Sequence, residues 1–398
     1  MKLPLPLFLR NDSFDNEKRV ELTPHFQDVT CSGSHYNMGF QQGIRYKHKI
    51  LRNEKILLDT ELFRKFVPSF IPLPFLVNAA KRFIPMFIPS VLAGEKNTVL
   101  RLDGIADGAG VSRDLIFLAQ TLEIILDHIP YNMGCTTVAI SGERYVTGEP
   151  VIIKNFDFLD NFRSLNIIRK SNPENGIPSV ELSLTSIAGA HAGMNRAGLA
   201  ISYNYGYSRE PQQPRVPITC HVQTALERFE NTEDAVNFLI NKPFAAGAIL
   251  TLCDSKSRMV TIEASASKKA LKYPDSNGLL INTNLYTMKE MQQVSIPDDA
   301  KFDSNMPYGL DKIKVHESNK IRHSCAERLL NAEKKIFPST LLELLANHGP
   351  DNNAYDNCLC RHIPVFHTVA SAIMFPVRKT AYLLLGSPCR NKYHRYQL

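Results

Sequence analysis

A succession of short apolar segments between residues 135 and 385 constrains the fold of this chain more than any other feature of its sequence. Two pairs of helix-like segments interrupt it, near residues 218–229 and 232–241 and again near 321–336 and 339–346. The strand-like segments are residues 135–140, 150–153, 165–169, 180–184, 199–203, 248–253, 260–264, 279–282, 368–374 and 380–385. Strand runs that alternate with helix pairs, without an internal repeat, predict an α+β fold in which helices cover layers of sheet.

The region before residue 135 predicts helices instead. Residues 35–64 have helical character, with Ser34 as the N-cap and with Gly39 and Gly43 allowing close packing on one helix face. Residues 112–128 predict a further amphipathic helix. A length of 398 residues admits two or three domains, although large α+β folds also reach this size as a single domain.

Residues 63–92 form a stretch rich in Phe, Ile, Leu and Pro, with Lys81 and Arg82 at its centre. Five prolines and the central charge pair argue against a membrane-spanning helix, which needs about 20 apolar residues. Residues 45–82 carry nine Lys and Arg against three acidic residues, a pattern that suits an anionic lipid surface. Three interpretations stay open for this stretch: an acyl-chain pocket wall or lid, an element in peripheral contact with a membrane, and two buried core helices.

Charge and cysteine spacing exclude several classes of partner. The net charge of +7 is mild and basic residues elsewhere are scattered, so no nucleic-acid partner is predicted. Phosphate-binding loops and dinucleotide fingerprints are absent from the sequence, and no cofactor is predicted. Cys358 and Cys360 are separated by one residue, which makes a poor zinc clip, and no second pair completes four ligands. No metal is therefore predicted either.

The beginning of the sequence does not have the pattern of a secretory signal. Its apolar run is short, Pro4 and Pro6 interrupt it, and no small-residue cleavage site follows. The eight cysteines are spread over a long chain, which is not the pattern of a disulfide scaffold. We expect a cytoplasmic protein, with signal-free export and peripheral membrane association as alternatives.

Cys135 differs from the other cysteines because it follows Gly134 at the start of a predicted strand. A self-cleaving N-terminal nucleophile needs this arrangement, since the glycine leaves room for the thiol to attack the preceding carbonyl. Cleavage frees an α-amine on Cys135, and its unperturbed pKa of about 8 lets the neutral fraction act as general base for the thiol. The alternative is a buried structural cysteine.

A series of sequence blocks in a fixed order favours the nucleophile. The blocks are residues 33–39 (GSHYNMG), 134–137 (GCTT), 154–158 (KNFDF), 193–199 (GMNRAGL), 283–284 (TN), 358–362 (CLCRH) and 386–388 (GSP). With them the sequence resembles the acyl-coenzyme A:isopenicillin N acyltransferase family of cysteine N-terminal-nucleophile hydrolases, and more distantly the choloylglycine hydrolases and acid ceramidases. The resemblance covers roughly residues 33–388. It implies a four-layer αββα sandwich of the N-terminal-nucleophile hydrolase type.

The resemblance also implies how the chain is divided and processed. Cleavage between Gly134 and Cys135 would leave an N-terminal segment, residues 1–134, and a catalytic chain, residues 135–398. The two would form one domain and persist as an α/β heterodimer. Cys135 would be the nucleophile, and Asp157 would accept a hydrogen bond from its amine. The alternative for Asp157 is a turn residue after a strand.

Further roles follow from the same resemblance. Asn204 and Asn284 would donate hydrogen bonds to the developing oxyanion, a contribution that typically changes the rate a hundred- to a thousandfold per donor. Leu285 replaces the His that many relatives have at that position, and this departure alters the pocket wall or weakens the role of Asn284. Arg361 would approach the thiolate and the substrate. His191 is a tempting extra base, but a lone His is more often a hydrogen-bonded structural residue.

Thiolate attack on an amide or thioester carbonyl would give an S-acyl enzyme, from which water gives hydrolysis and an amine gives acyl transfer. We expect an amidohydrolase acting on small-molecule or lipid N-acyl amides, with long acyl chains if residues 63–92 line the pocket. An acyltransferase and a catalytically silent relative that binds lipid or a membrane are the alternatives.

Overall fold

The structure is a computed structural model that describes residues 13–16, 18–21, 26–59, 75, 91–125, 134–302, 312–349, 357–363 and 366–398. Of the apolar stretch 63–92, only Phe75, Val91 and Leu92 belong to the described residues, so its predicted roles fall outside them. Among the described residues, no helix has both the length and the apolar character needed to cross a membrane.

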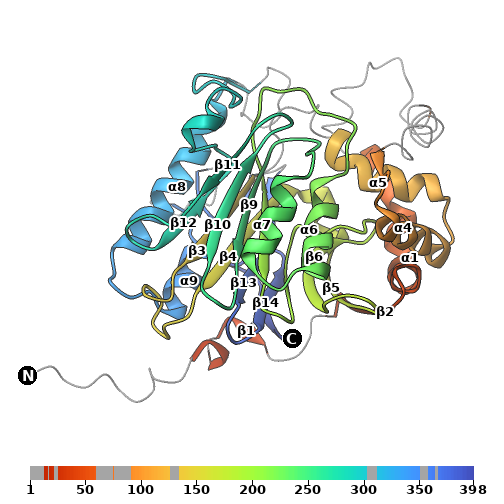
Figure 1. Cartoon of the computed structure of the whole chain (residues 1–398), viewed down its shortest axis with the longest axis horizontal. Helices are drawn as coiled ribbons and strands as arrows, with labels where there is room; N and C mark the ends of the chain where they lie inside the picture. Colours follow the sequence, from red (N-terminus) through yellow and green to blue (C-terminus); the bar gives the residue numbers. More distant parts are fainter. Residues whose placement is uncertain are drawn as a thin grey trace, which may run out of the picture.

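Two sheets form the centre of the molecule (Figure 1). The first has seven strands in the order β1 (Val20–Glu21), β15 (Tyr393–Gln397), β14 (Thr380–Leu385), β13 (Phe366–Phe375), β4 (Val151–Leu159), β3 (Gly134–Ile140) and β12 (Leu279–Asn282). The second has eight strands in the order β11 (Lys269–Lys272), β10 (Met259–Ala264), β9 (Ala248–Cys253), β8 (Ala200–Tyr205), β7 (Ala192–Asn195), β6 (Ser179–Leu184), β5 (Asn166–Pro173) and β2 (Asp28–Gly33). Neighbouring strands are antiparallel except for two pairs, β1 with β15 and β2 with β5.

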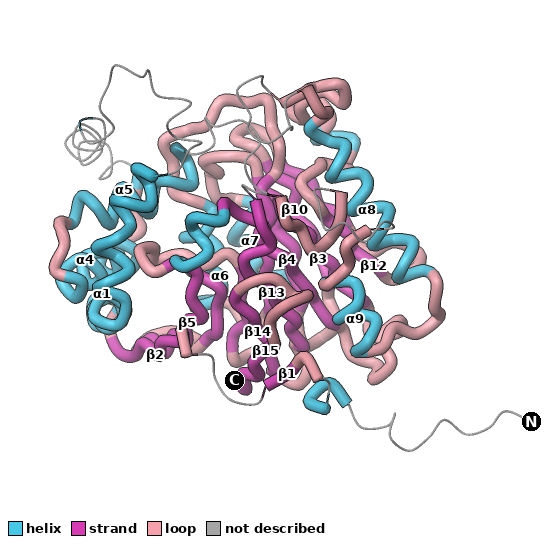
Figure 2. Tube along the Cα trace, turned by 180° about the vertical axis from the view of Figure 1, so that it is seen from behind, coloured by secondary structure: helices cyan, strands magenta, loops and turns pink. Residues whose placement is uncertain are grey.

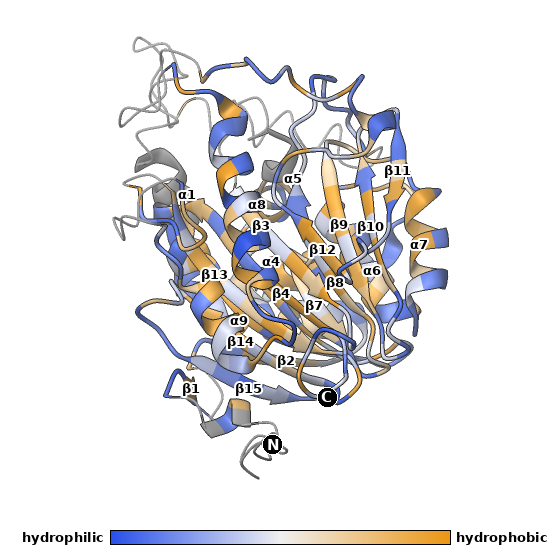
Figure 3. Ribbon diagram, turned by 90° about the vertical axis from the view of Figure 1, so that its left-hand side faces the viewer, coloured by the Kyte–Doolittle hydropathy of each residue, from blue (hydrophilic) through white to orange (hydrophobic). Residues whose placement is uncertain are grey.

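The strands of both sheets contain many hydrophobic residues (Figure 3). Their side chains alternate between the two faces of each sheet, and this alternation builds the layers. In β3 and β4, Ala139 and Ile152 pack into the core between the sheets, whereas Val138 and Ile153 pack against the helices outside. Those helices are α8 (Val315–Asn331) and α9 (Pro338–Leu345). The outer face of the second sheet packs in the same way against α6 (Ile218–Arg228) and α7 (Thr232–Ile240). The predicted four-layer αββα sandwich is therefore confirmed.

Among the described residues before Cys135, helices α1 (His35–Asp59), α4 (Lys96–Ala109) and α5 (Arg113–Ile125) lie beside the β2–β5 edge (Figures 1 and 2). The helices α1 and α4 touch at their backbones. A methyl group at Gly39 would overlap the carbonyl oxygen of Arg101, and one at Gly104 would overlap that of Tyr36. The close packing predicted for Gly39 is confirmed. The short 3-10 helices are η2 (Ser13–Asn16), η4 (Asp160–Leu165) and η5 (Lys289–Met291).

Several predicted elements differ from the observed ones. The helix predicted over residues 321–336 begins earlier and ends earlier, as α8. The helix α4 was not predicted, because its glycines resemble helix breakers in the sequence. The short strands β1, β2, β7, β11 and β15 were also not predicted. Strands β1, β7 and β11 have four residues or fewer and show too little alternation, whereas β2 and β15 pair in part with strands far along the chain.

Candidate active site

Cys135 lies at the start of β3, and its side chain belongs to the core between the two sheets. Both peptide groups of this residue are held by side chains from distant elements. The backbone N–H donates to Oδ1 of Asn284 (2.9 Å), and the carbonyl oxygen accepts from Nη1 of Arg322 on α8 (2.7 Å). The residue is 2% exposed. The nucleophile predicted from the sequence is thus a buried thiol in a fixed backbone.

A buried lysine stands beside this thiol. Lys154 lies on the neighbouring strand β4, and its Nζ donates to Oδ1 of Asn204 (3.0 Å) and to the carbonyl oxygen of Tyr203. It lies close enough to the Cys135 thiol for the charges of the two groups to interact. Burial raises the pKa of the Cys135 thiol, although the charges of Lys154 and Arg322 lower it in part. Burial also lowers the pKa of Lys154. Both shifts favour the uncharged forms, so Lys154 can accept a proton at a lower pH than an exposed lysine would.

Asp157, also on β4, provides a second polar group next to the Gly134–Cys135 bond. Its Oδ1 accepts from Oγ1 of Thr368 on β13 (2.7 Å), and its Oδ2 lies 3.5 Å from Nη1 of Arg361. Gly134 is paired directly with Asp157 across the β3–β4 ladder. A methyl group at Gly134 would overlap Nη1 of Arg361. Glycine at this position therefore lets the guanidinium group lie against the backbone, and a side chain here would displace it.

Asn204, at the end of β8, contacts the site through Lys154. Its Oδ1 accepts hydrogen bonds from Nζ of Lys154 (3.0 Å) and from Oγ1 of Thr137 (2.7 Å). Its Nδ2 donates to the carbonyl oxygens of Asn282 and Thr283, both at 3.1 Å. Both amide hydrogens of Asn204 are thus engaged, and Asn204 contacts the site by accepting a hydrogen bond from Lys154.

Asn284 and Arg322 form a linked pair behind the nucleophile. Nη2 of Arg322 donates to Oδ1 of Asn284 (3.1 Å) and to Oδ1 of Asn319 (2.6 Å). Nδ2 of Asn284 donates to the carbonyl oxygen of Tyr205 (2.8 Å). The nitrogen of Cys135, here part of a peptide bond, has Asn284 as its acceptor. The role predicted for Asp157 concerns the free amine and stays a prediction.

The fold thus brings Cys135, Asp157, Asn284 and Arg361 around the Gly134–Cys135 bond. Asn204 does not contact this bond directly but is hydrogen-bonded to Lys154. Sequence reasoning missed Lys154 and Arg322. A lysine inside the fully buried strand VIIKNFDFL is a signal that could have been used for Lys154. Arg322 lies 187 positions from Cys135 and no local pattern connects the two.

His191 packs against this region without a hydrogen bond to Cys135. Its ring stacks on that of Phe156, with the ring centroids 4.5 Å apart. Burial lowers the pKa of His191 to about 3, with smaller contributions from Lys154 and Arg169. The ring is therefore neutral at physiological pH.

A group with a metal-binding donor set lies beside Arg361. The side chains of His348, Cys360, His362 and Cys389 place one ligand atom each within 4.8 Å of the others. The sequence predicted no group of four ligands because only ligands close in sequence were considered. In the folded chain, His348 and Cys389 complete a group of four with Cys360 and His362.

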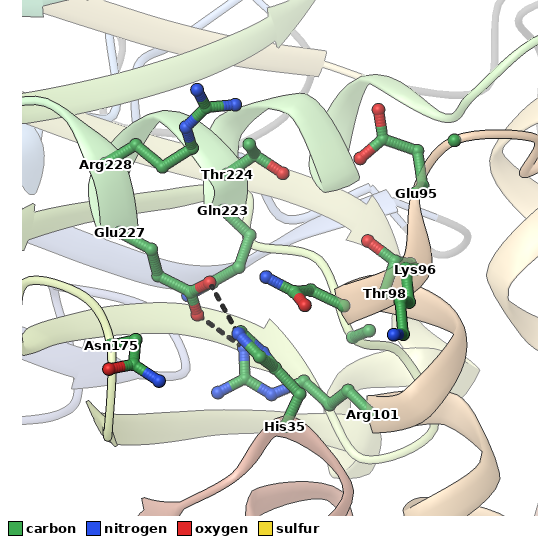
Figure 4. Close-up of a pocket in the computed structure, with 13 residues that line it drawn as sticks. His35, Glu95, Lys96, Thr98, Arg101, Asn175, Gln223, Thr224, Glu227 and Arg228 are labelled. Atoms are coloured by element: carbon green, nitrogen blue, oxygen red, sulfur yellow. Dashed lines mark hydrogen bonds and ion pairs between the residues drawn. The ribbon is translucent and has the colours of Figure 1, made fainter.

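A polar cavity of about 190 Å³ lies elsewhere, between the starts of α1 and α4 and the end of α6 (Figure 4). Arg101 donates to Glu227 there (2.9 Å), and His35 lies 3.9 Å from the same carboxylate. The residues predicted for catalysis do not line this cavity. It marks a buried charge network between the segments before and after Cys135.

Comparison with known proteins gives the family. The sequence model of the acyl-coenzyme A:6-aminopenicillanic acid acyl-transferase family matches residues 146–390, which begin after Cys135 and include Lys154, Asp157, Asn284 and Arg361. No curated protein matches the sequence.

Solved structures of low sequence identity also match. An N-acylethanolamine-hydrolyzing acid amidase ortholog from Caenorhabditis elegans is 16% identical, covers 61% of this chain and 93% of its own, and gives a TM-score of 0.42. Penicillin V acylase from Agrobacterium tumefaciens is 16% identical, with coverages of 66% and 86% and a TM-score of 0.40. A conjugated bile acid hydrolase from Clostridium perfringens is 14% identical, with coverages of 66% and 97% and a TM-score of 0.38. The family match spans more than half of the chain, and the protein therefore belongs to the acyl-coenzyme A:6-aminopenicillanic acid acyl-transferase family.

Proposed function

We propose that this protein is a cysteine N-terminal-nucleophile amidohydrolase that cleaves itself between Gly134 and Cys135 and then hydrolyses N-acyl amides through an S-acyl enzyme. One observation carries the proposal. A buried lysine lies close enough to the Cys135 thiol for their charges to interact, while Asn284 and Arg322 hold both peptide groups of the same residue. A structural cysteine does not need these polar partners, whose burial is costly unless they are used.

Self-cleavage would begin with transfer of the thiol proton to neutral Lys154. The Cys135 sulfur then adds to the carbonyl carbon of Gly134, and the C–N bond breaks as the nitrogen takes a proton. The product is a thioester between Gly134 and Cys135, with a free α-amine on Cys135. Water hydrolyses this thioester to a carboxylate on Gly134 and regenerates the thiol. In the precursor the α-amine does not yet exist, which is why a separate base is needed at this stage.

In the mature enzyme the α-amine would serve as the base. Its neutral form takes the thiol proton as the sulfur attacks the acyl carbonyl, and later returns that proton to the leaving amine. Asp157 would orient the amine, since it is paired with Gly134 beside it. Asn284 would stabilise the oxyanion, with Asn204 holding Lys154 or donating after its own hydrogen bonds rearrange. Arg361 would contact the acyl side of the substrate, where its guanidinium group would bind and orient a carboxylate or carbonyl group.

The substrate class is an N-acyl amide, and long acyl chains are our proposal on the basis of the apolar stretch 63–92. The same stretch supports peripheral membrane contact through its basic flanks. Acyl transfer to an amine is the second candidate, because the matching family is named for this reaction. Transfer would use the same S-acyl enzyme, with an amine in place of water.

After cleavage we propose that residues 1–134 and 135–398 stay together as an α/β heterodimer. Strand pairing supports this, because β1 and β2 lie in sheets whose other strands belong to the second chain. The buried Arg101–Glu227 ion pair joins the same two segments.

The deciding experiment is the intact mass of the purified protein beside the variants Cys135→Ala and Cys220→Ala. Cys220 is equally buried and lies on α6, outside the site, so it controls for the loss of a buried thiol. Two fragments that meet at 134/135 are expected in the wild type and in Cys220→Ala, and one mass in Cys135→Ala. A panel of N-acyl amides of increasing chain length then measures hydrolysis, and added amines measure transfer. An uncleaved wild type without activity on any member of the panel would indicate the catalytically silent, lipid-binding relative instead.

A further inference from the structure

Four metal-binding side chains from three separate segments meet next to Arg361. His348 follows the end of α9, Cys360 and His362 flank Arg361 on either side, and Cys389 follows β14. Their ligand atoms all lie within 4.8 Å of one another. Cys360 is buried and the other three side chains are partly exposed, so the group is accessible from solvent on one side.

The distances suit a tetrahedral zinc ion. Nε2 of His362 lies 3.4 Å from Sγ of Cys360 and 3.2 Å from Sγ of Cys389. Zn–S and Zn–N bonds of about 2.3 and 2.0 Å give a sulfur–nitrogen edge of about 3.5 Å in a tetrahedron. The ring centroids of His348 and His362 lie 5.3 Å apart at 84°, which keeps the two imidazoles from stacking. Small shifts of the side chains would therefore place four ligands around one ion.

The donor set agrees with the same ion. Two thiolates and two imidazoles are a common ligand set of structural zinc sites, and four protein ligands close the coordination shell. The two thiolates balance the charge of Zn²⁺, so a partly buried site carries no net charge. Calcium and magnesium prefer oxygen ligands, which this set does not offer.

We infer that His348, Cys360, His362 and Cys389 form a structural Zn²⁺ site. Binding of the ion displaces the two thiol protons and forms two Zn–S and two Zn–N bonds, with no change of oxidation state. The inference does not depend on the proposed reaction, because it concerns a site beside Arg361 rather than the nucleophile.

A zinc ion at this site would cross-link the loop that carries Arg361 to the segments around His348 and Cys389. In the described part of the connection between α9 and β13 there is no helix and no strand. The backbone of this loop is held by individual hydrogen bonds, such as Cys360 N–H to the carbonyl oxygen of Asn347 (2.9 Å) and Arg361 N–H to Oγ1 of Thr368 (2.9 Å). Zinc bonded to the residues on both sides of Arg361 would fix its backbone and hold its guanidinium group beside Asp157.

Metal analysis of untagged protein, purified without chelators, tests the inference. Mass spectrometry with an inductively coupled plasma is expected to find about one Zn²⁺ per chain in the wild type. The variants Cys389→Ser and His348→Gln are expected to lose most of it. Cys358→Ser is the matched control, since Cys358 is buried two residues from Cys360 but does not belong to the group. It is expected to keep its zinc.

Replacement of the metal by Co²⁺ gives a second readout that does not require the serine variant to fold. Tetrahedral thiolate ligation is expected to give strong visible absorption and a sulfur-to-cobalt charge-transfer band, both weakened or shifted in His348→Gln. A metal-free wild type that takes up no Co²⁺ would overturn the inference. So would a mass two hydrogens below that of the reduced chain, with Cys360 and Cys389 joined in one peptide, because a disulfide removes both thiolate ligands.

Discussion

Arg322 donates a hydrogen bond of 2.7 Å to the carbonyl oxygen of Cys135, although the two residues are 187 positions apart. The same guanidinium group contacts Asn284, which accepts the hydrogen bond from the Cys135 backbone nitrogen. One arginine on α8 therefore controls the backbone on both sides of the nucleophile. The position of the thiol depends on the docking of a helix as well as on the strand that carries it.

Replacement of Arg322 by methionine is expected to slow self-cleavage at least tenfold and to lower the free energy of unfolding. The loss removes the Arg322 donor from the carbonyl of Cys135 and from Oδ1 of Asn319, at about 1–3 kcal/mol for an unsatisfied group, and one of the two donors of Oδ1 of Asn284. Gel electrophoresis over time and thermal unfolding measure the two effects. Arg328→Met, on the exposed face of the same helix, is the control. Wild-type cleavage in Arg322→Met would show that this contact is dispensable.

Lys154→Met is expected to slow self-cleavage about a hundredfold or more, the usual contribution of a general base. In the wild type, burial lowers the pKa of Lys154 and raises that of the thiol. The base must be neutral before it accepts the proton, so the cleavage rate should rise with pH until it passes the lowered pKa of Lys154. First-order rate constants between about pH 6 and pH 9 measure this profile. A wild-type rate that does not change with pH would argue against a lysine base.

Gly134→Ala is expected to displace the guanidinium group of Arg361 and to slow self-cleavage, while the fold is retained because a long side chain can move aside. A double-mutant cycle with Arg361→Ala isolates this effect. If the methyl group acts through the arginine, the two changes are not additive, and the second costs little once the first is present. Additive effects would mean that the methyl group hinders the thiol directly.

Gly104→Val is expected to destabilise the fold by several kcal/mol or to prevent folding, because its side chain would enter the backbone contact between α4 and α1. Thermal unfolding and the yield of soluble protein report the change. Lys96→Ala, at an exposed position of α4, is the control and should be close to the wild type. A stable Gly104→Val protein would show that the two helices can separate.

Vesicle co-sedimentation tests the basic apolar stretch. Each Lys or Arg near an anionic surface contributes about 1 kcal/mol, so reversal of both charges in Lys81→Glu/Arg82→Glu should weaken binding more than tenfold. Neutral vesicles of phosphatidylcholine are the control and should bind little. The absence of any binding by the wild type to anionic vesicles would remove the membrane interpretation and leave the acyl-chain pocket or core helices.

Sequence patterns predicted much of the sandwich, because apolar alternation is strong where strands are buried on one or both faces. Residues 248–253, 279–282 and 380–385 were predicted with the bounds that β9, β12 and β14 have. The start of α8 was missed, because most of the residues that it buries there are polar. Ser318, Asn319 and Arg322 are directed to the site rather than to an apolar core. The periodicity of apolar residues does not reveal a helix face that is buried but polar.

The candidate site was predicted to the extent that its residues lie in local blocks. Cys135 and Asp157 stand next to each other because β3 and β4 follow one another in sequence and pair. Lys154 lies within the same block, but its position next to the thiol depends on the pairing register. The group formed by His348, Cys360, His362 and Cys389 depends on the return of the chain after β14 and has no local signature.

The order in which the chain is synthesised gives a further meaning to the contacts around the scissile bond. Gly134 and Cys135 leave the ribosome long before Asn284, Arg322 and Arg361, and the partner strand of β1 is made last of all, as β15. A nascent chain therefore carries the thiol but lacks the groups that hold it. On the proposed mechanism, self-cleavage would occur only after the later segments have been synthesised and folded. A prematurely terminated chain would stay a single inactive polypeptide.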